Sequence, residues 1–111
     1  MRATRERVRV EHGATEVLYT VHRDTTESRA ASTSFEADVN SAARQFERFY
    51  LGVRIEPRAS IVEGSNCAVA LIVSGGFGPE YLDAIWSRQL ARFGLAARRA
   101  NAEADLKAIA S

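Results

Sequence analysis

With 111 residues, the chain has the length of one domain that can bury a real core, and its 46% hydrophobic and 26% charged residues do not favour intrinsic disorder. A formal net charge of +1 excludes a general electrostatic attraction to nucleic acids or to anionic membranes. A lone cysteine excludes an internal disulfide. No apolar run approaches the roughly 20 residues of a transmembrane helix. We therefore expect a single domain over residues 1–111 that is cytoplasmic and has no signal peptide.

The N-terminal part of the chain predicts a β-hairpin. Residues 5–11 alternate in polarity, with Val8 and Val10 on one side of a half-exposed strand. A tight turn at residues 12–14 leads to a second strand over residues 16–22. Because the connection is short, the two strands should be neighbours in the sheet.

A polar loop over residues 23–32 precedes the first predicted helix. Thr33 and Glu36 have the spacing of a capping box, and Gly52 is placed to end the helix. Apolar residues recur between them at helical spacing: Phe35, Val39, Ala42, Ala43, Phe46, Phe49 and Tyr50. We expect this stripe to pack on the sheet.

Residues 67–73 predict a strand that is covered on both faces, because they are apolar without interruption. The bulkier side chains should face the helices: Cys67, Val69, Leu71 and Val73. The strand before it, over residues 53–56, is interrupted by Pro57, with Ile61 and Val62 placed to resume it. Proline cannot donate to a ladder, and this predicts an edge or bulged strand.

A glycine-rich turn over residues 74–78 leads to a last helix that begins at Pro79. The expected inner face of that helix carries Leu82, Ile85, Trp86, Gln89 and Phe93. Gly94 is a candidate break, which the sequence leaves open. Residues 96–110 are rich in alanine and are predicted to be helical.

The element order ββαββα predicts an α+β two-layer sandwich. A four-stranded antiparallel sheet in the order first, second, fourth, third would carry both helices on one face. The Arg-rich first strand and the Pro57 strand would then form the edges. This arrangement is a permuted ferredoxin-like fold, and a sandwich with another strand order is the alternative.

Such a sandwich leaves the other face of the sheet to be covered. The residues expected there are apolar: Leu18, Ala68, Ala70 and Ile72. We therefore predict that a second copy of the chain covers this face. The alternative is that the segment 96–110 covers it within one chain.

The glycines of the turn, Gly75, Gly76 and Gly78, precede a helix start, where free N–H groups attract anions. The segment lacks the Gly-Lys-Ser/Thr of a phosphate-binding loop, and its third glycine is misplaced for a dinucleotide fingerprint. A plain strand-to-helix turn is therefore favoured over an anion site.

Four arginines fall on the predicted last helix and its extension: Arg88, Arg92, Arg98 and Arg99. Together with the arginines of the N-terminus, Arg2, Arg5, Arg7 and Arg9, they suggest a stripe that contacts phosphates. A solvated helix face is favoured over this interpretation, because acidic residues are nearly as numerous as basic ones.

No catalytic or metal-binding set can be assembled from the sequence. His12, His22 and Cys67 match no zinc spacing, and Cys67 lies in an apolar strand where a thiol is inert. A pocket between sheet and helices would use His22, Tyr19 and Tyr50 as polar groups. We expect no metal and no cofactor.

The favoured function is a small non-enzymatic binding or assembly module that associates with itself, as a dimer, or with another protein. Two alternatives stay open: a nucleic-acid-binding protein that uses the arginine stripe, and a small ligand-binding protein or enzyme. No membrane partner is expected.

Overall fold

The computed structural model describes residues 8–11, 14–24, 35–63 and 66–100. Their elements, in chain order, are β1 (Val8–Glu11), β2 (Ala14–Arg23), α1 (Phe35–Phe49), β3 (Arg54–Glu63), β4 (Asn66–Gly75), α2 (Pro79–Ala91) and β5 (Leu95–Arg99). Among these residues, neither helix is long and apolar enough to cross a membrane. The capping box at Thr33 and the histidine at position 12 lie outside them.

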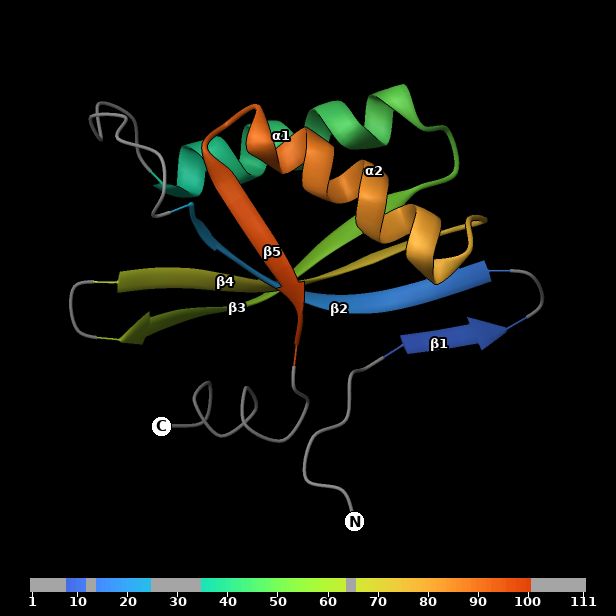
Figure 1. Cartoon of the computed structure of the whole chain (residues 1–111), viewed down its shortest axis with the longest axis horizontal. Helices are drawn as coiled ribbons and strands as arrows, with labels where there is room; N and C mark the ends of the chain where they lie inside the picture. The colour runs from blue at the N-terminus through green and yellow to red at the C-terminus, as the bar shows by residue number, and fades with distance from the viewer. Residues whose placement is uncertain (1–7, 12–13, 25–34, 64–65, 101–111) are drawn as a thin grey trace, which may run out of the picture.

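The sheet has the strand order β1-β2-β4-β3, and every described pair is antiparallel. Both helices lie on one side of it (Figure 1). The α+β two-layer sandwich and the order of the first four strands are thus as predicted. Strand β3 is an edge, and its register with β4 shifts between Pro57 and Ala59, which is the bulge that a proline within a strand predicts.

The helical prediction for residues 96–110 is wrong where the structure describes them. Helix α2 ends at Ala91, Gly94 takes a φ of +69°, and β5 then pairs with residues 19–23 of β2. Alanine has the highest helix propensity of the amino acids, but such propensities are small, and burial of Leu95 and Ala97 against the main core outweighs them. Residues 101–110 lie outside the described part.

Strands β1 and β5 share one edge of β2. Strand β1 pairs with residues 14–17 and β5 with residues 19–23, while the Ala100 N–H donates to the Leu18 carbonyl at 2.8 Å. The position predicted for the first strand alone therefore holds two strands, from opposite ends of the described chain. The permuted ferredoxin-like arrangement did not include this second strand.

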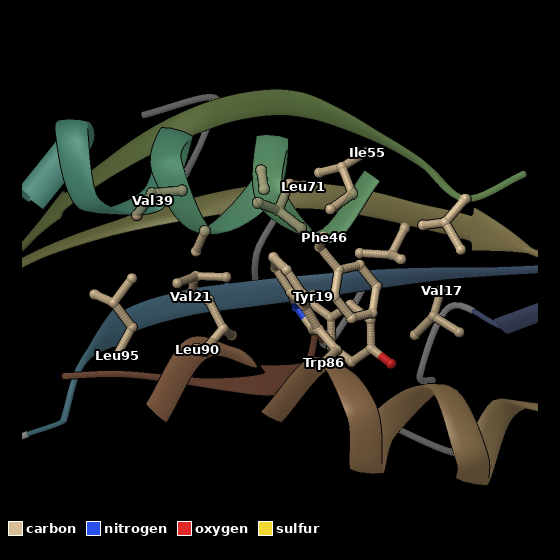
Figure 2. Close-up of a cluster of buried hydrophobic side chains, with 14 of the residues drawn as sticks. Val17, Tyr19, Val21, Val39, Phe46, Ile55, Leu71, Trp86, Leu90 and Leu95 are labelled. Atoms are coloured by element: carbon tan, nitrogen blue, oxygen red, sulfur yellow. The ribbon is translucent and has the colours of Figure 1, made fainter. Parts of the chain in front are cut away.

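The main core lies between the sheet and the helices (Figure 2). Trp86 of α2 is fully buried and packs against the rings of Phe46 and Tyr19, with centroids 5.0 and 6.4 Å away. Its indole N–H has no acceptor among the described residues. The Gln89 side chain ties the two helices together by donating to the Ala42 carbonyl at 3.1 Å.

Strand β4 is covered on both faces, as its apolar run predicts. Val69, Leu71 and Val73 belong to the main core, whereas Ala70 and Ile72 belong to a smaller cluster on the opposite face. Of Cys67 only the backbone position is described.

Candidate interaction surface

Four aromatic side chains form a continuous row where the end of α1 meets the start of α2. Phe49 and Tyr50 contact each other with ring centroids 4.9 Å apart, Tyr50 contacts Phe77 at 5.7 Å, and Phe77 contacts Tyr81 at 5.2 Å. We call these four residues the aromatic row. The ring of Phe46, which is buried in the core, packs against the ring of Tyr50 with the two centroids 4.8 Å apart. This contact attaches the row to the core.

The row is exposed at both ends. Phe49 is 78% exposed and Tyr81 54% exposed, and the neighbouring Leu51 is 91% exposed. An isolated exposed apolar residue needs no explanation, but connected ones form a patch of the kind used for protein contacts. The sequence prediction that Phe49 lies in the core stripe of α1 is therefore wrong.

Local backbone geometry positions the row. Gly52 has a φ of +90°, which allows the chain to leave α1 and turn directly into β3. At the other side, a Cβ on Gly75 would lie 3.0 Å from Val53 Cγ2, so a glycine permits the close approach of β4 to this turn. Phe77 follows two residues later and reaches Tyr50.

Asp83 of α2 joins three elements. The Tyr19 hydroxyl of β2 donates to Asp83 Oδ1 at 2.6 Å, and the Arg99 guanidinium of β5 donates to both carboxylate oxygens, the shortest contact being 2.6 Å. We call these three residues the Asp83 network. Burial, together with the hydrogen bond to Asp83, raises the pKa of Tyr19 far above its usual range. The phenol is thus a fixed donor and not an acid or base near neutral pH.

The glycines proposed for anion binding are separated by the turn. Gly75 is the buried end of β4, whereas Gly76 and Gly78 are exposed. Gly78 is the N-cap of α2 and makes no side-chain cap bond. No further group that would hold an anion joins them in the described contacts, so anion binding stays a prediction.

The arginine stripe does not form on one helix. Arg88 and Arg92 are exposed at the end of α2, but Arg98 and Arg99 lie in β5, where successive side chains point to opposite faces. Arg99 is in the Asp83 network. The prediction of a helical stripe is therefore wrong in its geometry, although nucleic-acid binding itself is untested.

The residues predicted to meet a second copy come together on the face of the sheet opposite the helices. Leu18, Ala70 and Ile72 form a cluster with Ala100, and Ala68 packs against it. Their burial, at most 7% exposed for the three, is already complete within one chain. A contact between copies at this face stays a prediction, but these side chains are not presented to solvent.

The polar groups suggested for a pocket do not converge. His22 lies on the opposite side of β2 from Tyr19, since their positions differ by an odd number of residues, and its Nδ1 is 2.9 Å from the Arg23 carbonyl. Tyr50 belongs to the aromatic row. Within the described part of the chain, no group of three His, Cys, Asp or Glu residues could hold a metal.

Sequence reasoning missed the aromatic row because helical spacing assigns Phe49 and Tyr50 to the buried stripe. One signal was available: Phe49, Tyr50 and Leu51 are consecutive, and a helix cannot bury three consecutive side chains on one face.

No family model, curated protein or solved structure matches this chain.

Proposed function

We propose that the protein is a small self-associating assembly module that uses the aromatic row as its contact surface. The supporting observation is the connected row itself, which is exposed at Phe49 and Tyr81 and half-buried between them. Tyrosine and other aromatic residues are enriched where protein contacts concentrate their binding energy. Because the ring contacts already restrain the side chains, little rotamer freedom is lost on binding.

A second copy of the chain is the proposed occupant. An aromatic side chain can bury roughly 150–250 Å², so the exposed fractions of Phe49, Tyr81 and Leu51 add up to a patch of about 400 Å². A two-fold contact uses the same patch twice and buries about 800 Å², below the size of a stable interface. We therefore expect a weak, concentration-dependent dimer. The net charge of +1 opposes it little.

Sedimentation velocity over a range of protein concentrations tests this function. We expect the wild-type protein to associate at tens of micromolar, and Phe49→Ser to weaken association by about tenfold or more, as loss of a central aromatic contact does. Val10→Ser is the control, because Val10 is 63% exposed but lies on β1 and takes no part in the ring contacts of the row. A wild-type protein that stays monomeric at millimolar concentration contradicts the proposal.

A further inference from the structure

The outer edge of β3 carries an arrangement of side chains that resembles a neighbouring strand. The Ile55 N–H donates to Glu47 Oε2 at 2.7 Å, and Arg44 donates to the Ile55 carbonyl at 3.3 Å. Arg44 and Glu47 also pair with each other at 3.0 Å. One carboxylate acceptor and one guanidinium donor thus bind the two backbone groups of a single residue. We call the pair the Ile55 clasp.

These backbone groups are the ones that an added strand would use. In an antiparallel ladder, residues alternate between bonding the partner strand and pointing away from it. Ile55 lies opposite Val73 of β4, yet its N–H and carbonyl contact α1 side chains, so they point to the free edge. The next residue with this orientation is Pro57, which has no N–H.

We propose that the Ile55 clasp closes the first half of the β3 edge, at Ile55 and Pro57, to strand addition by a second copy of this chain. Exposed edge strands pair readily with other chains, and proteins block them with charges and prolines. Here the clasp satisfies the pairing groups of Ile55, and Pro57 removes the next donor. The occupant excluded is β3 of another copy, which would meet the same edge in an antiparallel, two-fold pairing.

Ordinary helix-to-strand attachment is the competing explanation of the clasp. Arg44 and Glu47 are three residues apart on α1, where exposed ion pairs contribute little to stability. If the contacts only attach α1 to β3, then removing them changes stability and leaves the association state unchanged. If they close the edge, removing them creates a new mode of association.

Amide hydrogen exchange is the first measurement. With Glu47→Ala we expect exchange at the Ile55 N–H to accelerate by about tenfold or more, because its acceptor is gone while the strand stays in place. Gln45→Ala, at an exposed neighbouring position of α1, is the matched control and should leave exchange at Ile55 unchanged. Unchanged exchange at Ile55 in Glu47→Ala overturns the proposal.

Association is the second measurement, made in the Phe49→Ser background, where the aromatic row contributes about tenfold less. Adding Arg44→Ala and Glu47→Ala should strengthen association above that of Phe49→Ser alone, with Ile55 protected again as concentration rises. Arg48→Ala, one turn from Arg44 and exposed, is the control. A clasp-free variant that stays monomeric while its Ile55 amide remains unprotected overturns edge closure.

Trp86 fluorescence, from the single buried tryptophan, confirms that each variant is folded. If the double substitution prevents folding, Arg44→Ala alone keeps the bond between Ile55 and Glu47 and frees the Ile55 carbonyl. That variant should associate more strongly than Arg48→Ala. Equal association of these two single variants overturns edge closure and leaves the role of the aromatic row untouched.

Discussion

At the scale of single residues, the Asp83 network fixes three elements that are distant in sequence. The Asp83 carboxylate accepts from Tyr19 of β2 and from Arg99 of β5, so α2 is held to both strands at one point. Hydrogen bonds to a charged group are stronger than neutral ones. No sequence pattern predicts this network, because its members join only through the pairing of β5 with β2.

Tyr19 should make the folded state sensitive to alkaline pH. The unfolded chain releases the phenol proton near pH 10, whereas the folded chain retains it because the pKa of Tyr19 is raised. The unfolded state then binds fewer protons, so stability is present below pH 10 and is lost as pH rises, by up to about 1.4 kcal/mol per pH unit. Urea unfolding monitored by Trp86 fluorescence measures this loss.

Tyr19→Phe should remove the part of the loss of stability above pH 10 that comes from the Tyr19 phenol. Tyr81→Phe, at an exposed position, is the control and should retain that loss. Equal pH dependence of the two variants would contradict the account of Tyr19.

Arg99 and Arg98 offer a test of the ion pair within the Asp83 network. Arg99→Ala should lower the free energy of unfolding by about 1–2 kcal/mol, because it removes a bidentate bond whose guanidinium is largely shielded from water. Arg98→Ala, at the exposed neighbouring position, should cost less than about 0.5 kcal/mol. Denaturant unfolding of both variants decides the point, and equal losses contradict it.

At the scale of elements, two glycines with positive φ end the helices. Gly52 follows α1 at a φ of +90° and Gly94 follows α2 at +69°. Gly52→Ala should destabilise the fold by about 1 kcal/mol, because a side chain in the left-handed region is strained. Gly76→Ala is the control, since a Cβ there meets nothing within 4 Å and no positive φ is involved. Thermal unfolding should rank the two variants clearly, and an equal cost contradicts the assignment.

The sequence predicted the strands and helices well where periodicity decides them. The apolar run in β4 and the proline in β3 placed one strand inside the sheet and the other at its edge, and both predictions are confirmed. Strand β5 was missed because its short, alanine-rich segment carries no strand signal of its own. Its conformation follows from pairing with β2 and from Gly94, that is, from tertiary context.

At the scale of the whole molecule, the centre of the sheet is buried on both faces. The helix side was predictable from the alternation of Val17, Tyr19 and Val21, which all lie in the main core. The opposite side was predicted to need a second copy, yet Leu18 and Ile72 are buried within one chain. The three consecutive residues from Phe49 to Leu51 indicated that one of them is exposed, but not which, because exposure of Phe49 depends on where α1 ends relative to β3.

Burial of the face opposite the helices within one chain has a thermodynamic consequence. Ile72→Ala removes a side chain that is 7% exposed and should cost about 2–4 kcal/mol of unfolding free energy. If the chain itself covers this face, Ile72→Ala lowers the unfolding free energy by the same amount at low and high protein concentration. Leu71→Ala, on the helix side of the sheet, is the control and should also show a loss that does not depend on concentration. If a second copy covers it, stability of the wild-type protein rises with concentration by mass action, and Ile72→Ala loses that rise.

Denaturant unfolding at two protein concentrations about a hundredfold apart distinguishes these cases, since mass action over that range amounts to about 2.7 kcal/mol. Both concentrations are used in the Phe49→Ser background, so that association through the aromatic row adds less concentration dependence of its own. A concentration dependence that survives Phe49→Ser and disappears with Ile72→Ala would move the contact between copies from the aromatic row to the sheet. A loss for Ile72→Ala that is independent of concentration leaves the aromatic row as the surface through which the chain associates.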